Sequence, residues 1–164
     1  MNRTPQQVWN TVIAAKERAK GRLEDELSNA RRDHKVLVAA CEEAQASVRH
    51  ADDQRVTHEK CIVALLSDAR GISPTNYLSH DLYREPLAQA LEIAQAGLRR
   101  ASDAAEAQQR VVERLGVQVR RADAALDAVR EQLRIVVGTT QRRVDERTDE
   151  EAVEAAAARM RRGG

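Results

Sequence analysis

The chain has 164 residues, of which 27 are Lys or Arg and 26 are Asp or Glu, so its net charge at pH 7 is +1. This balance excludes the strong basic field that drives nucleic-acid binding. Only three residues are aromatic, namely Trp9, Tyr77 and Tyr83, whereas a compact domain of this length normally fills its core with large side chains. Abundant Ala, Glu, Arg and Leu with few Gly, Pro or aromatic residues is typical of long helices and coiled coils.

The strongest periodic signal predicts a first helix over about residues 5–70. Thr4-Pro5-Gln6-Gln7 combines a Thr N-cap, a Pro at the first helical position and a Gln three residues after the cap, which is the pattern of a helix start. From Trp9 onward, alternating steps of four and three residues reach apolar side chains at 13 of 18 positions. Such a heptad repeat indicates a seam that packs against another helix. The first seam comprises Trp9, Ile13, Lys16, Lys20, Leu23, Leu27, Ala30, His34, Leu37, Cys41, Ala44, Val48, Ala51, Arg55, His58, Ile62, Leu65 and Ala69.

A second helix is predicted over about residues 82–137, after a tip loop at 71–86. The loop contains two of the three prolines, and Gly71 suits a left-handed helix end. Asp81 is a candidate N-cap for the second helix, with Pro86 in its first turns. Heptad steps from Leu87 meet apolar side chains at 14 of 15 positions. The second seam comprises Leu87, Leu91, Ala94, Leu98, Ala101, Ala105, Gln108, Val112, Leu115, Val119, Ala122, Leu126, Val129, Leu133 and Val136.

Two matched seams around a short connection predict an all-α fold, a long antiparallel two-helix coiled-coil hairpin. The connection is too short to return along an arm of about 90 Å, so the arms must run antiparallel. Folding about residue 78, the middle of the loop, pairs Leu27 with Val129 and Lys20 with Val136. A parallel homodimer through the same seams is the competing arrangement, because periodicity alone does not exclude it.

The seam is predicted to fail toward the chain termini. In the same pairing Trp9 meets Arg147, which is a poor core pair. Gly138 costs about 1 kcal/mol relative to Ala inside a helix, and Thr148-Asp149-Glu150-Glu151 resembles a second capping box. We therefore expect a kink near residue 138 and a C-terminal segment at 139–162 that overhangs the first helix by about a dozen residues.

Two ends of the hairpin are candidate partner-binding surfaces. At the termini, an apolar patch with a basic rim is left uncovered by the predicted pairing, and such patches are typical of interaction sites. At the tip, aromatic residues on an exposed loop are favoured binding anchors, although they could equally plug the hairpin end. The candidate residues are Val8, Trp9, Val12, Ile13, Lys16 and Lys20 at the N-terminal end, Tyr77 and Tyr83 at the tip, and Arg159, Arg161 and Arg162 near the C-terminus.

No pattern in the sequence predicts catalysis, a cofactor or a metal site. The glycines are isolated, and neither His-Glu-x-x-His nor Cys-x-x-Cys occurs. His34 and His58 occupy seam positions 24 residues apart, where they are expected to set the register. Cys41 and Cys61 lie too far apart on one helix for a disulfide and are expected to be free thiols that fill small spaces. The lack of a long apolar run or a signal peptide predicts a cytoplasmic protein.

A chain made of one antiparallel helical hairpin, rich in Ala and Arg and with basic termini at one end, resembles the FliJ/YscO family. The length and composition look most like the Hrp-type members of plant-associated bacteria, which serve virulence. The resemblance implies a central stalk of a type III secretion system that is similar to the coiled coil of a rotary ATPase gamma subunit. The implied partners are the hexameric export ATPase, the cytoplasmic domain of the export gate and secretion chaperones. Trp9, Ile13, Lys16 and Lys20 would then face the ATPase ring, and the protein would lie peripherally at the inner membrane.

A second hypothesis is a self-associating coiled-coil adaptor or scaffold. Its motivation is the polar residues within the first seam, because these suit pairing between chains better than pairing within a hairpin. The two hypotheses differ in their expected oligomeric state, which light scattering over a range of concentrations measures. The residues on which this alternative depends are Lys16, Lys20, His34, Arg55 and His58.

Overall fold

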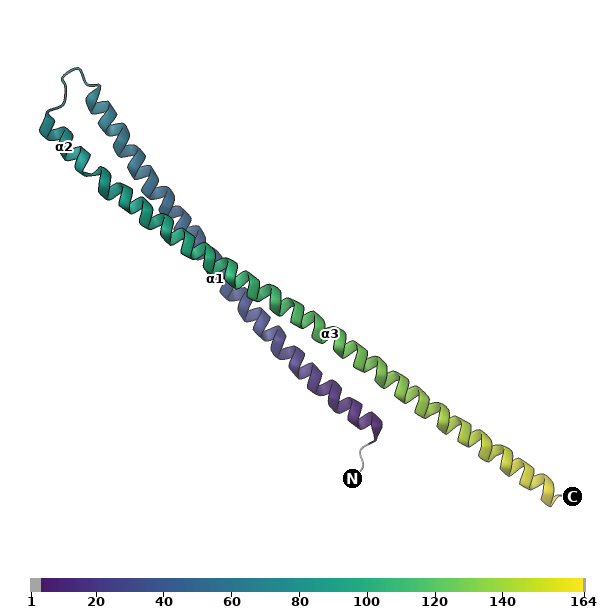
Figure 1. Cartoon of the computed structure of the whole chain (residues 1–164). Coiled ribbons are helices and arrows are strands. Elements are labelled where there is room, and N and C mark those ends of the chain that lie inside the picture. Colours follow the sequence, from purple (N-terminus) through teal and green to yellow (C-terminus); the bar gives the residue numbers. More distant parts are fainter. Residues whose placement is uncertain (1–3, 164) are drawn as a thin grey trace. The chain divides into compact units, whose positions relative to one another are not determined.

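The structure, a computed structural model that describes residues 4–163, consists of three α-helices (Figure 1). Helix α1 spans Pro5–Leu66, α2 spans Pro74–Leu82 and α3 spans Arg84–Arg162. No strand occurs within the described range. The predicted all-α hairpin is confirmed, with α1 as one arm and α3 as the other.

The start of α1 is the predicted capping box. The Gln7 backbone N–H donates to Thr4 Oγ1 at 3.3 Å, and the Thr4 backbone N–H donates to Gln7 Oε1 at 2.9 Å. These reciprocal bonds satisfy two donors at the helix start, and Pro5 follows at the first helical position. The sequence therefore encodes the start of helix α1 at this capping box.

The connection after α1 is tighter than the predicted loop. Helix α1 ends at Leu66, and the chain reverses at Gly71, whose φ of +70° is the left-handed conformation that favours glycine. The predicted loop at 71–86 instead contains α2, where Ser73 Oγ accepts from the Asn76 backbone N–H at 3.2 Å and Pro74 follows the cap. The α2–α3 junction precedes Pro86, because Pro has no N–H to continue the backbone ladder.

Helix α3 has no restart near Gly138. It is one continuous helix from Arg84 to Arg162, so the predicted C-terminal segment at 139–162 is helical and belongs to α3 itself. Thr148 does not act as a cap: its Oγ1 donates back to the Asp145 carbonyl at 2.7 Å, which a helix interior permits. One glycine costs only about 1 kcal/mol, and the flanking helix propensities outweigh that cost.

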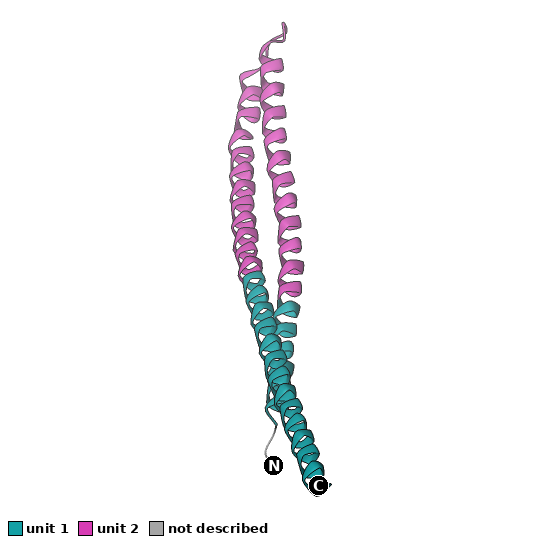
Figure 2. Cartoon of the chain, turned by 90° about the vertical axis from the view of Figure 1, so that its right-hand side faces the viewer, with its two compact units in different colours: residues 1–26, 115–164 teal, residues 27–114 magenta. Residues whose placement is uncertain are grey.

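The chain divides into two compact units, coloured separately in Figure 2. Unit 1 comprises residues 1–26 and 115–164, and unit 2 comprises residues 27–114. Within the units, all 15 positions of the second seam and 17 of the 18 of the first are buried or half-buried, Ala69 being exposed. Beyond Val136 every described residue of α3 is exposed. The seams and the end of the second seam were thus predicted correctly.

The pairing between the seams differs from the prediction. In unit 1, Lys20 Nζ lies 2.7 Å from Asp123 Oδ1, whereas folding about residue 78 placed Lys20 beside Val136. In unit 2, Arg84 Nε donates to Glu59 Oε1 at 2.9 Å. The chain turns at Gly71 rather than mid-loop, and the partner of Lys20 moves by 13 residues (136 against 123). Because this shift is close to two heptads, the same seam positions stay inside while their partners change.

Candidate partner-binding surfaces

The corrected register covers much of the predicted N-terminal patch. Trp9, Val12 and Ile13 are half-buried, and only Val8 of the four apolar residues is exposed. The start of α1 lies beside α3, since one groove is lined by Thr4, Pro5, Gln6, Val136, Val137, Thr140 and Gln141. The predicted patch is therefore partly covered, because the start of α1 lies beside residues 136–141 of α3 and not beside Arg147, the predicted partner of Trp9. A binding role for these residues remains a prediction.

Part of the basic rim of that patch forms ion pairs within unit 1. Lys20 donates to Asp123 at 2.7 Å and lies 3.5 Å from Glu24 Oε1. Arg130 Nη2 donates to Glu17 Oε1 at 2.9 Å. Lys16 is half-buried at its seam position. These cross-helix pairs involve exposed groups and so fix the register more than they add stability.

The Lys20–Asp123 pair makes the stability of unit 1 depend on pH. The hydrogen bond lowers the pKa of Asp123 and raises the pKa of Lys20. The Asp123 contribution is present above its unfolded pKa of about 4 and is lost as the pH falls through the lower folded value. The Lys20 contribution is present below about pH 10 and is lost as the pH rises through its raised value.

A double-mutant cycle of Lys20→Met and Asp123→Asn, read by urea unfolding, measures this coupling. We expect favourable coupling at pH 7 and weaker coupling at about pH 2, because protonation of Asp123 at low pH removes the charge that Lys20 pairs with. Equal coupling at the two pH values would contradict the assigned ion pair.

The predicted tip aromatics occupy different environments in unit 2. Tyr77 is half-buried in α2, whereas Tyr83 is exposed at the end of α2 with its ring centroid 6.1 Å from that of His58. His58 Nε2 is hydrogen-bonded to the His80 carbonyl at 2.8 Å. Arg84 joins α3 to α1 by donating to Glu59 and joins α3 to α2 by donating to Asp81, and these bonds raise its pKa. The tip is thus an ordered end of the hairpin, and only Tyr83 presents an exposed ring.

Sequence reasoning missed other exposed apolar residues in α2 and near the end of α1. Leu78 and Leu82 lie one turn apart in α2, and Val63 and Leu66 lie near the end of α1; all four are exposed. The signal that could have found the first pair is Ser73-Pro74, an N-cap followed by Pro, which marks a short helix rather than a loop.

The predicted C-terminal arginines lie on the part of α3 that no other helix covers. Arg159, Arg161 and Arg162 are exposed, as is every described residue from 137 onward. Gln141 is the last residue of α3 in the groove beside Thr4, and Arg159 lies about 27 Å further along the helix. The structure therefore does not bring these arginines to Trp9. The uncovered stretch 142–162, here called the free segment, is longer than the predicted overhang.

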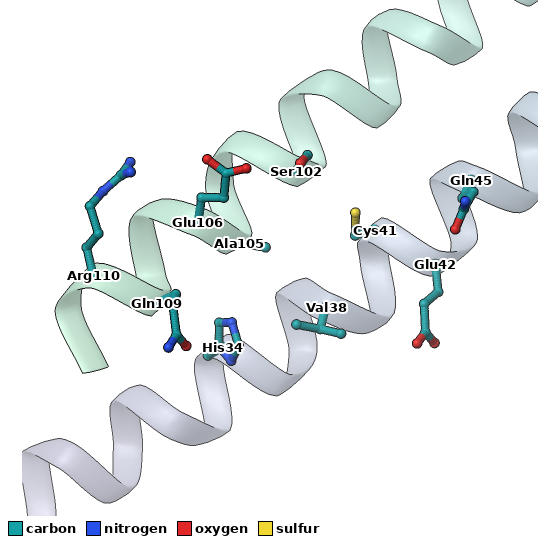
Figure 3. A pocket seen from close by; sticks show the side chains of 10 residues that line it. All are labelled: His34, Val38, Cys41, Glu42, Gln45, Ser102, Ala105, Glu106, Gln109 and Arg110. Carbon is teal, nitrogen blue, oxygen red and sulfur yellow. The ribbon is translucent and has the colours of Figure 1, made fainter. Parts of the chain in front are cut away.

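A groove in unit 2 lies between α1 and α3 and has a volume of about 460 Å³ (Figure 3). Cys41 and His34 line it from α1, and Ala105 and Ser102 line it from α3. The groove exists because small side chains on α3 leave space between the helices. Nearby, Gln108 Nε2 donates to the Ala30 carbonyl at 3.1 Å, which supports a register role for this polar seam residue.

The described residues provide no group of three or more His, Cys, Asp or Glu side chains suited to a metal ion. Cys41 and Cys61 are both free thiols; Cys41 is half-buried, but Cys61 is exposed and therefore does not fill a core space. Within residues 4–163, no helix is both long and apolar enough to cross a membrane.

A family model described as bacterial type III secretion protein (HrpB7) matches residues 4–160 of the chain. The chain belongs to this family. The match covers both helical arms, the tip and nearly all of the free segment, so family membership applies to the whole hairpin. No curated protein and no solved structure shows significant similarity to the chain.

Membership of a type III secretion family places the predicted partners within the secretion apparatus. The exposed surfaces of the hairpin are therefore candidate contacts with other components of that apparatus. The surfaces available in the described structure are the free segment of α3 in unit 1 and the exposed apolar residues at the end of unit 2.

Proposed function

We propose that the chain is a non-enzymatic central-stalk component of the type III secretion apparatus. It binds the hexameric export ATPase through the α1–α3 end of unit 1 and contacts the export gate through other exposed residues. The resemblance to FliJ/YscO proteins and the membership of a type III secretion family support this role. The observation that carries it is the free segment, a lone exposed helix that continues α3 past the start of α1.

The geometry of the free segment suits a narrow opening. A single α-helix with its side chains is about 10–12 Å wide, whereas a pair of packed helices is nearly twice as wide. The free segment can therefore enter an opening, such as the centre of a protein ring, that excludes the paired arms. Its last turn carries Arg159, Arg161 and Arg162, which can bind acidic groups on the surrounding subunits.

The other exposed surface supports a second contact. Leu78, Leu82 and Tyr83 lie at the end of unit 2 and are available to an apolar surface of another component. Exposed Leu and Tyr side chains close together are favoured contact residues. In the proposal this surface serves the export gate or a secretion chaperone.

The test uses the full chain and the purified export ATPase of the same secretion system. We expect the wild type to bind the ATPase and to raise its oligomerisation or ATP hydrolysis. Arg159→Glu combined with Arg162→Glu should weaken binding by about tenfold, because both side chains would then repel acidic ring groups. Arg99→Glu combined with Arg100→Glu is the matched control, since these arginines are exposed on α3 in unit 2.

Two results would overturn the stalk proposal. One is a wild-type chain that neither binds the ATPase nor changes its assembly or turnover. The other is equal loss of binding in the control and the test variant, which would reveal nonspecific charge attraction. Far-UV circular dichroism of both variants verifies that helicity is retained.

A further inference from the structure

The free segment has an unusual order of charges along α3. Four acidic residues, Asp149, Glu150, Glu151 and Glu154, precede a stretch of four alanines at 155–158, and three arginines follow at 159, 161 and 162. All of these residues are exposed. From residue 149 to residue 162, opposite charges are therefore separated into two blocks, whereas both signs are interleaved at residues 142–147.

This order prevents the two blocks from pairing with each other within the helix. Neighbours on a helix are three or four residues apart, and the alanines occupy those positions between the blocks. Glu150 and Glu154 are four apart and Arg159 and Arg162 are three apart, so each block holds a repulsive pair. Among the described residues, none of the seven charged residues of the two blocks forms an ion pair.

The helix termini explain only part of the pattern. Arginines in the last turn of α3 interact favourably with the helix dipole. The acidic block would be favourable at a helix start, but α3 runs through it without interruption. Arg147 lies three and four residues before Glu150 and Glu151, at the spacing of helix neighbours. It forms no ion pair with them among the described residues, so the acidic block has no partner within α3.

An apolar stripe runs along one face of the helix at residues 153–160. At about 100° per residue, Val153, Ala156, Ala157 and Met160 fall within a sector of about 100°. Val153 is 69% exposed and Met160 is 82% exposed. Glu150, Glu154 and Arg161 follow the same flank of this stripe, about 60–100° from Val153, whereas Arg159 and Arg162 point to other sides.

We propose that the free segment pairs with the free segment of a second copy of this chain, in an antiparallel arrangement about a two-fold axis between Ala156 and Ala157. In this register Val153 of one copy faces Met160 of the other, and the alanines at the centre let the two backbones approach closely. Arg161 lies level with position 152 of the second copy, between its Glu150 and Glu154. A two-fold axis places residues of one flank beside the same flank of the other copy, so both arginines meet acidic pairs.

This surface is separate from the hairpin seam. The stripe at Val153 lies about 100° around the helix from the seam line that ends at Val136. The seam positions are already covered within each unit, so pairing between copies through the seams has no free surface comparable with the stripe. The proposal does not rest on the stalk role, and self-pairing would compete with any other partner for Arg161.

The interface is short and carries few large side chains, so the association is expected to be weak. Val153 and Met160 supply most of the apolar contact, and helices of this length are marginal without further packing. We expect a dissociation constant of about 10–500 µM that rises with salt, since the arginine–glutamate contacts are screened.

Charge reversal with rescue tests the proposal on the full chain. Sedimentation velocity and light scattering measure self-association up to roughly 500 µM at low salt. Arg161→Glu alone, and Glu150→Arg with Glu154→Arg alone, should each weaken self-association by at least about tenfold. An equimolar mixture of the two variants should form a heterodimer, because every contact in the mixture is complementary again. Arg159→Glu is the matched control and should leave self-association unchanged.

Each remaining outcome overturns the proposal. A wild-type chain that stays monomeric throughout the range has no such interface. Self-association that survives Arg161→Glu uses another surface, and equal weakening by Arg159→Glu would show general charge attraction. Failure of the mixed variants to associate would contradict the proposed antiparallel register. None of these results depends on binding to the export ATPase, and Arg159 and Arg162 serve the stalk test, so the two proposals fail separately.

Discussion

Replacing Leu126 by Ala is expected to lower the free energy of unfolding by about 3 kcal/mol. Leu126 is only 2% exposed and belongs to the seam of unit 1. The substitution removes buried methyl groups and leaves a cavity that two long helices cannot readily close, and such changes typically cost about 2–5 kcal/mol. The slightly better helix propensity of Ala offsets only a few tenths of a kcal/mol. Urea unfolding followed by far-UV circular dichroism measures the change.

Leu82→Ala is the matched control for this prediction. It removes the same atoms from a side chain that is 76% exposed in α2, so the expected loss is below about 0.5 kcal/mol. Equal losses at the two positions would mean that Leu126 does not pack against the other helix.

Replacing Ile62 by Ala is expected to destabilise unit 2 by about 3 kcal/mol. Ile62 is also 2% exposed, and it lies on α1 near the tip. Hydrogen exchange should lose protection mainly within residues 27–114, while the protected amides of unit 1 keep their exchange rates. Leu126→Ala should produce the reverse pattern.

Ile93→Ala provides the control for Ile62, because Ile93 is 70% exposed on α3 in unit 2. Its substitution should leave exchange nearly unchanged. If Ile62→Ala raised exchange equally in both units, the chain would unfold as one cooperative body and the division into two units would have no energetic meaning.

These two positions have the largest expected effects because few side chains are fully covered. Most seam positions are half-buried, as expected where only two helices pack and solvent reaches both sides of the seam. The apolar residues that are buried within the described range are Leu27, Ala30, Ala51, Ile62, Leu115 and Leu126. Stability is therefore spread along the seams and concentrated at a few large residues.

The candidate surfaces were only partly predictable. The C-terminal arginines were found from their position, and the structure leaves them on an uncovered helix. The predicted N-terminal patch depended on one particular pairing of the arms, so it failed together with that pairing. Val153 and Met160 were missed because heptad counting follows the seam of α3, and their stripe lies on a different face of the helix.

The sequence by itself determined the two long helices and the buried face of each arm, but not α2, which lies within the predicted loop. The capping box at Thr4, the left-handed turn at Gly71 and the heptad positions up to Val136 are local features, and the structure contains each of them. Local backbone and side-chain preferences are sufficient to encode them.

Only the tertiary structure decided the register between the arms. A shift of nearly two heptads leaves the same apolar positions inside, so the heptad pattern does not distinguish the two registers. Cross-helix contacts such as Lys20–Asp123 and Arg84–Glu59, together with a chain reversal at Gly71, distinguish one register from the next. That choice in turn decides that Trp9 is half-buried and that residues 142–162 remain free to bind another molecule.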